Sequence, residues 1–134
     1  MSGMVEMELA RIIINESSDQ QFIFLREKGG QRQFPIVISM MEALAIDRFV
    51  KEQETPRPLT HELMNKVIGS LGANISRVEV TELKNGTFYA NLVLQRDGSE
   101  IEVDARPSDA IALAIRNSSQ IFVAEQVLEE VMPF

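Results

Sequence analysis

The chain has 134 residues, of which 45% are apolar and 25% are charged, the proportions of one globular domain with its own core. Its 13 basic and 20 acidic side chains give a net charge of −7, which argues against broad, charge-driven binding to nucleic acid. Cysteine is absent and His61 is the single histidine, which excludes disulfides, thiolate catalysis, cysteine-ligated zinc and histidine-rich metal sites. No apolar run approaches a membrane span and the N-terminus lacks a signal-peptide pattern, so we expect a cytoplasmic protein without membrane contact.

The first part of the chain alternates β-branched and apolar runs with turn residues and then changes to a helical pattern. Ser39 precedes Glu42 by three residues, the spacing of a capping box, and apolar residues follow. This pattern predicts a helix from Met40 to about Val50. The preceding runs predict three strands, at residues 5–15, 21–26 and 33–38.

A proline-rich break separates this helix from the next one. Pro56 and Pro58 bias the residues before them away from helix. Thr60 has the features of an N-cap, and Gly72 those of the residue that follows a helix. A linking helix is therefore expected over about 60–71.

The second part of the chain repeats the order of the first. Asn85-Gly86 is a strong hairpin signal that favours a type I′ turn between two strands. Ile101, Val103 and Ala105 alternate with acidic residues and are expected to face inward from a further strand. Pro107 fits the first position of a helix that is apolar nearly all round and therefore buried.

An internal duplication accounts for this repetition. Residues 11–16 align with residues 77–82, and residues 42–46 align with residues 109–113. The fold class that follows is α+β, with mostly antiparallel strands packed against helices. We expect a single domain over residues 1–134, with β-β-β-α units over about 5–50 and 74–117 and a C-terminal strand and helix over about 121–132.

The densest group of candidate functional residues lies where the strand ending near Ala105 turns into a helix. Asp104 and Arg106 are two residues apart on this strand and therefore face the same way. A carboxylate, a guanidinium and a helix N-terminus could together hold a metal and a phosphate. Asp109 could equally stabilise the first helical turn, and Arg106 could simply pair with Asp104.

Glu42 occupies the position in the first unit that Asp109 occupies in the second. The capping box explains Glu42 fully. If the duplication sets the two helix starts side by side, however, the two carboxylates face a common cleft. Asp104, Asp109 and Glu42 would then be the ligands of a divalent metal, Mg or Mn, the usual device for phosphodiester cleavage.

The segment around the two prolines is the other candidate. It presents Arg57 and His61 beside the start of the linking helix. His61 is the side chain here that titrates near neutral pH without help from its surroundings, as a catalytic acid or base should. The alternative is that His61 is a surface or capping residue.

Four segments occur in a characteristic order along the chain: Pro35-Ile36 with Glu42-Ala43, Pro56-Arg57-Pro58-Leu59-Thr60-His61, Asn85-Gly86-Thr87-Phe88-Tyr89-Ala90, and the run from Val103 to Ala114. In this order they resemble the bifunctional nuclease domain family, whose members are described as having both DNase and RNase activity. The resemblance extends from about Val5 to Val131 and implies an α+β fold and nuclease activity. It transfers no established catalytic set.

Two functions are therefore considered. The first is a nuclease, a hydrolase acting on DNA and RNA, in which a divalent metal activates water and Arg106 or Arg57 steadies the added negative charge. It predicts that Asp104→Ala abolishes activity without loss of the fold. The alternative is a non-catalytic regulatory or interaction module that binds a partner protein or a small anion, in keeping with the acidic composition.

A homodimer is expected with either function. The first hairpin carries apolar residues on both of its faces, with Ile12 and Ile14 on one and Leu9 and Ile13 on the other. Two apolar faces on one hairpin favour contact with a second copy of the chain.

Overall fold

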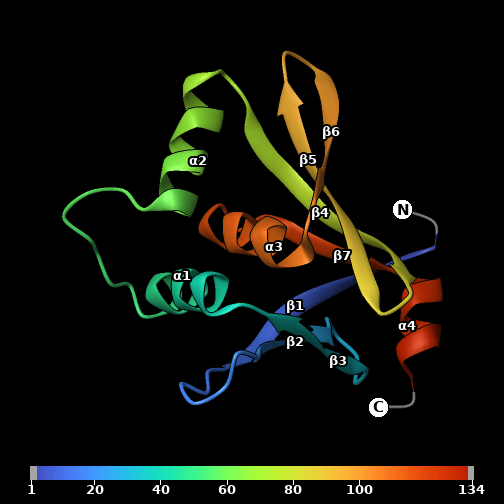
Figure 1. The fold of residues 1–134 in the computed structure, drawn as a ribbon. Coiled ribbons are helices and arrows are strands. Elements are labelled where there is room, and N and C mark those ends of the chain that lie inside the picture. Colours follow the sequence, from blue (N-terminus) through green and yellow to red (C-terminus); the bar gives the residue numbers. More distant parts are fainter. Residues whose placement is uncertain (1–2, 133–134) are drawn as a thin grey trace.

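Seven strands form one sheet in a computed structural model that describes residues 3–132 (Figure 1). The strand order is β3-β2-β1-β7-β4-β5-β6, and β4 pairs with β7 in parallel whereas all other neighbours are antiparallel. The expected α+β class is therefore confirmed. The strands are β1 (Met4–Ile13), β2 (Gln21–Glu27), β3 (Gln33–Ile38), β4 (Asn74–Lys84), β5 (Thr87–Arg96), β6 (Ser99–Ala105) and β7 (Gln120–Ala124).

Helix α3 (Pro107–Arg116) lies at the centre of the molecule, between α1 (Met40–Val50) and the strands of the second half (Figure 1). It packs against α1, against α2 (Thr60–Ser70) and against β4, β5 and β7. Its residues 110–114 are at most 1% exposed, which confirms the prediction of a helix buried nearly all round. The remaining helix is α4 (Glu125–Val131).

Small residues let α1 and α3 approach closely. Ala43 of α1 and Ala112 of α3 are fully buried in the same core cluster, and the two helices pack against each other. At the end of α3 the Nη2 of Arg116 donates a hydrogen bond to the carbonyl oxygen of Ala45, at 3.0 Å. Burial, helped by the nearby charge of Arg48, lowers the pKa of Arg116 below its ordinary value. Arg116 thus holds the two helices together at a cost in desolvation.

The turns and helix ends follow the sequence pattern with one exception. Asn85 and Gly86 have φ values of 50° and 78°, the positive pair that a type I′ turn requires. Gly72, at φ 79°, follows α2 as expected. The N-cap of α2 is Leu59 rather than Thr60, because Oε1 of Glu62 accepts the backbone N–H of Leu59 at 2.9 Å.

The expectation that β6 turns its apolar side into the core is wrong for two of its three residues. Ile101 is 42% exposed and Val103 40% exposed, whereas Ala105 packs against the core near α3. The physical reason is coverage, because α3 packs on β4, β5 and β7, whereas β6 at the edge of the sheet mainly contacts β5. An alternating pattern shows which residues share a face but does not show whether another layer covers it.

Both halves of the chain contain the expected order of three strands and a helix. The first unit is β1-β2-β3-α1 and the second is β4-β5-β6-α3, with β7 pairing with the first strand of each. A common origin of the two units stays a prediction. Among residues 3–132 there is no helix long and apolar enough to cross a membrane.

Truncation in the buried helix tests this account of the core. Leu113 is 1% exposed, so Leu113→Ala should lower the free energy of unfolding by about 2–5 kcal/mol in urea titrations. Val103→Ala, on the exposed edge strand, should cost less than about 1 kcal/mol. Equal losses for the two variants would contradict the exposed placement of β6.

Candidate functional site

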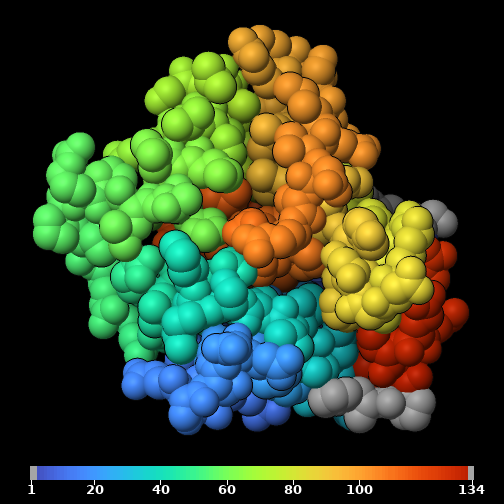
Figure 2. All heavy atoms as spheres, in the orientation of Figure 1, coloured from blue at the N-terminus to red at the C-terminus, as the bar shows by residue number. Residues whose placement is uncertain are grey.

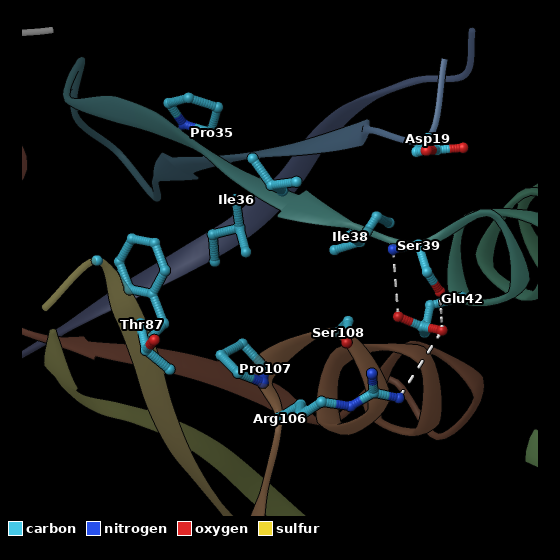
Figure 3. Close-up of a pocket in the computed structure, with 13 residues that line it drawn as sticks. Asp19, Pro35, Ile36, Ile38, Ser39, Glu42, Thr87, Arg106, Pro107 and Ser108 are labelled. Carbon is cyan, nitrogen blue, oxygen red and sulfur yellow. Dashed lines mark hydrogen bonds and ion pairs between the residues drawn. The ribbon is translucent and has the colours of Figure 1, made fainter. Parts of the chain in front are cut away.

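The starts of α1 and α3 lie side by side, and the carboxylate of Glu42 is buried between them (Figure 3). Glu42 is 5% exposed. Its Oε1 accepts the backbone N–H of Ser39 at 3.3 Å, and its Oε2 accepts the hydroxyl of the same serine. The predicted capping box is thereby confirmed, and it accounts for part of the hydrogen bonding that a buried carboxylate requires.

Arg106 links this carboxylate to the second helix start. Its Nε and Nη2 lie 2.9 and 2.8 Å from Oδ2 of Asp109, and Nη2 lies 3.8 Å from Oε2 of Glu42. Figure 3 shows Arg106 extending from the start of α3 toward Glu42. Arg106 therefore pairs with Asp109 and Glu42, not with Asp104. Its side chain is 66% exposed, so it faces solvent while spanning both carboxylates.

These contacts keep Glu42 ionised. Burial by itself raises the pKa of Glu42, but the hydrogen bonds from Ser39 and the positive charge of Arg106 outweigh this effect. The pKa of Glu42 consequently lies below its ordinary value of 4.5. In the same way, the hydrogen bond to Asp109 and the charge of Glu42 hold the pKa of Arg106 above its ordinary value.

Glu42, Arg106 and Asp109 form a network of charged side chains, and His61 of α2 belongs to it. Its Nε2 lies 2.9 Å from Oδ1 of Asp109, and its side chain is 11% exposed. Asp109 thus contacts the imidazole with one oxygen and the guanidinium of Arg106 with the other. A carboxylate that holds one ring nitrogen fixes the orientation and the tautomer of a histidine, as in hydrolases that use histidine as a base.

An open pocket of about 620 Å³ brings these residues together. Figure 2 shows the green atoms of α2, the cyan atoms of α1 and the orange atoms of β6 and the start of α3 gathered in this region. We call it the His61 pocket. Its charged and titratable lining contains five of the six candidate site residues, namely Glu42, His61, Asp104, Arg106 and Asp109.

Arg57 and Asp104 differ from the other candidates. Arg57 is exposed in the loop between α1 and α2 and lies outside the His61 pocket. Asp104 lines the pocket and is exposed, and its side chain makes no hydrogen bond or ion pair to any of residues 3–132. The sequence analysis treated Arg57 and His61 as a candidate separate from Asp104, Arg106 and Asp109, whereas the structure places His61 beside Asp109 and Arg57 outside the pocket.

The structure does not gather the three predicted carboxylate ligands around one point. Within the described chain no three Asp, Glu or His side chains are placed to hold a metal. Both oxygens of Asp109 already contact cationic or hydrogen-bonding groups, and both oxygens of Glu42 accept from Ser39. In this arrangement Glu42 and Asp109 pair with Arg106 within the protein.

Apolar residues that the sequence did not single out form another side of the His61 pocket. Leu92 of β5 and Leu113 of α3 lie deep and are 5% and 1% exposed, whereas Met64 of α2 and Val103 of β6 are 44% and 40% exposed. We call these four the apolar wall. Periodicity predicts a face for each residue within its own element, but the pocket forms only where α2, β5, β6 and α3 come together.

A second pocket, of about 470 Å³, shares part of its lining with the His61 pocket. Glu42 and Arg106 line both pockets, and here they are joined by Ser39 and Ser108 (Figure 3), and also by Phe88. Phe88 packs against Phe34, with ring centroids 5.7 Å apart. The ion pair therefore belongs to the lining of both pockets.

The sequence profile described as "Bifunctional nuclease domain" matches residues 23–133, a range that includes every residue of the network. The chain belongs to the bifunctional nuclease domain family. The chain is also 40% identical to an uncharacterised protein of Mycobacterium tuberculosis over 127 residues, which cover 95% of the chain and 76% of that relative.

Plant members of the bifunctional nuclease domain family are more distant. "Bifunctional nuclease 2" of Oryza sativa subsp. japonica is 29% identical over 107 residues, 77% of this chain and 33% of the rice protein. "Bifunctional nuclease 1" of Arabidopsis thaliana is 27% identical over 93 residues, 67% of this chain and 29% of that protein. The chain thus corresponds to about a third of each plant protein.

The pH dependence of stability tests the role of Glu42. Because its pKa is lower in the folded than in the unfolded chain, the carboxylate stabilises the fold above about pH 4.5, and this contribution is lost as the pH falls through the folded pKa. Glu42→Gln should therefore lower the free energy of unfolding by roughly 1–3 kcal/mol at pH 7.

The deficit of Glu42→Gln relative to wild type should shrink at pH 3, measured by urea unfolding. Glu129→Gln, on the exposed side of α4, is the matched control and should cost little at either pH. A deficit for Glu42→Gln that stays constant from pH 7 to pH 3 would contradict the assignment.

Proposed function

We propose that the chain hydrolyses phosphodiester bonds of DNA and RNA in the His61 pocket. The observation that carries this proposal is the hydrogen bond between His61 and Asp109, placed beside the exposed guanidinium of Arg106 in one pocket. Membership of the bifunctional nuclease domain family supports the same reaction. The names of the plant relatives support both substrates, although the chain corresponds to only part of their length.

His61 is the general base of the proposed reaction. Asp109 engages Nε2, which leaves Nδ1 as the ring atom without a hydrogen bond to residues 3–132. In a His61 side chain oriented this way, Nδ1 takes the proton of a water molecule that attacks phosphorus. A bond forms between the water oxygen and phosphorus, the bond from phosphorus to one ester oxygen breaks, and that oxygen acquires a proton from solvent. Because water is the nucleophile, the sugar 2′-hydroxyl is not required, and DNA and RNA both qualify.

Arg106 binds the phosphate and stabilises the charge that develops on it. A guanidinium can offer two parallel N–H groups to phosphate oxygens. Arg106 uses Nε and Nη2 for the two carboxylates, so Nη1 is the donor available to a ligand. Glu42 and Asp109 are positioning residues in this proposal, since they act through Arg106 and His61.

Assistance by Mg or Mn stays a prediction of the sequence. The proposed roles of His61 and Arg106 need no metal, whereas the metal hypothesis assigns Asp104 as a ligand. Chelation of metal ions and the substitution Asp104→Ala distinguish the two mechanisms. If His61 is the base and no metal takes part, the nuclease activity survives both.

The homodimer also stays a prediction. Of the four apolar residues that suggested it, Ile13 is 40% exposed, whereas Leu9, Ile12 and Ile14 are partly buried against the core. The free apolar face of the first hairpin is therefore smaller than its sequence pattern indicates.

Substitution of His61 is the direct test. His61→Ala should lower kcat on fluorescently labelled DNA and RNA oligonucleotides by about 10²–10⁴-fold, because the general base is lost. Asp109→Asn should also lower kcat, since the amide no longer holds the imidazole in the required tautomer. Arg57→Ala is the matched control, because Arg57 is exposed and outside the pocket.

Each variant should keep the wild-type circular dichroism spectrum and urea midpoint to within a small shift. Activity that survives His61→Ala, or that is absent from the wild-type chain on every nucleic acid tested, would contradict the proposal. Activity abolished by EDTA and by Asp104→Ala would favour the metal route instead.

A further inference from the structure

The apolar wall of the His61 pocket has no role in the reaction proposed above. Catalysis uses His61 and Arg106, yet the same pocket exposes Met64 at 44% and Val103 at 40%, above the buried Leu92 and Leu113. Exposed apolar surface that borders a polar, concave site is typical of a ligand-binding site. The wall and the charged end belong to one volume of about 620 Å³, within the range of pockets that hold one small ligand.

We propose that the apolar wall binds one unstacked base of a single-stranded nucleic acid, while the phosphate next to that base contacts Arg106. This inference rests on the proposed function and names its substrate class. A nucleotide unit has an apolar, flat base and an anionic phosphate, which match the two ends of the pocket. In a duplex the bases are stacked and paired, so a side-chain pocket reaches a base only after that base leaves the helix.

Arg106 marks the end of the pocket where an anion can bind. Its one positive charge faces the two carboxylates of Asp109 and Glu42, and His61 acting as a base is neutral, so the phosphate contact rests on the Nη1 donor that neither carboxylate uses. The side chain of Asp104 has no partner among the described residues. Its charge would repel a phosphate from the β6 side, which directs the phosphate toward Arg106 and the base toward the apolar wall.

A second copy of the chain is a poorer occupant of this surface. β6 is an edge strand and carries Glu100, Glu102 and Asp104 at alternate positions. Antiparallel pairing of two such strands would set acidic side chains near one another, which disfavours the contact. A nucleotide lies within the pocket and needs no pairing with the strand edge.

Equilibrium binding of two small probes tests the base contact without relying on catalysis. Adenosine 5′-monophosphate and ribose 5-phosphate share the phosphate and sugar but differ in the base. Isothermal titration calorimetry should show that adenosine 5′-monophosphate binds the wild-type chain about tenfold more tightly, because the base buries apolar surface against the apolar wall.

Met64→Ala should remove most of this difference, whereas Leu63→Ala should retain it. Leu63 is the matched control, because it neighbours Met64 on α2, is similarly exposed at 53%, and lies outside the pocket. Equal affinities of the two probes, or equal effects of the two substitutions, would overturn the inference.

Cleavage assays provide a second test of the base contact. Wild-type chain should cleave a single-stranded oligonucleotide at least about tenfold more efficiently, in kcat/KM, than the same strand annealed to its complement. Equal cleavage of both would overturn the base contact while leaving the nuclease proposal standing. A chain that cleaves neither, yet binds adenosine 5′-monophosphate in a Met64-dependent way, would overturn the nuclease proposal while supporting the base contact.

Discussion

The guanidinium of Arg106 lies between two carboxylates and connects the elements that form the candidate site. Arg106 contacts Asp109 within α3 and reaches Glu42 at the start of α1, and Asp109 in turn contacts His61 of α2. Three helices are thereby linked by one charge network. The constraint is physical, since a carboxylate as buried as that of Glu42 must be hydrogen-bonded and paired to remain charged.

The same constraint limits the chemistry of the site. The carboxylate oxygens accept from Ser39, contact His61 or pair with Arg106, and no three Asp, Glu or His side chains of the described chain converge as a metal site. The network fixes the orientation of its side chains, because each side chain is hydrogen-bonded or ion-paired to another. A histidine held by a carboxylate beside an exposed arginine is an arrangement suited to acid–base chemistry on an anionic substrate.

The His61 pocket combines this polar end with an apolar wall, and both depend on the position of α3. Its N-terminal turn supplies Arg106 and Asp109, and one turn later Leu113 reaches the wall. β6 runs past the core as an edge strand, which leaves Val103 exposed beside the pocket. The position of α3 therefore determines where the charged residues and the apolar wall of the His61 pocket meet.

The sequence alone determined the local structure. The extents of the strands and helices, the Asn85-Gly86 turn, the Ser39–Glu42 capping box and the burial of α3 all follow from periodicity and short-range hydrogen bonding, which act within a few residues. Only the tertiary structure decided that β6 is an edge strand, that Arg57 lies outside the pocket and that His61 pairs with Asp109. Those outcomes join residues far apart in the chain, and they depend on which elements pack together rather than on the pattern within any one of them.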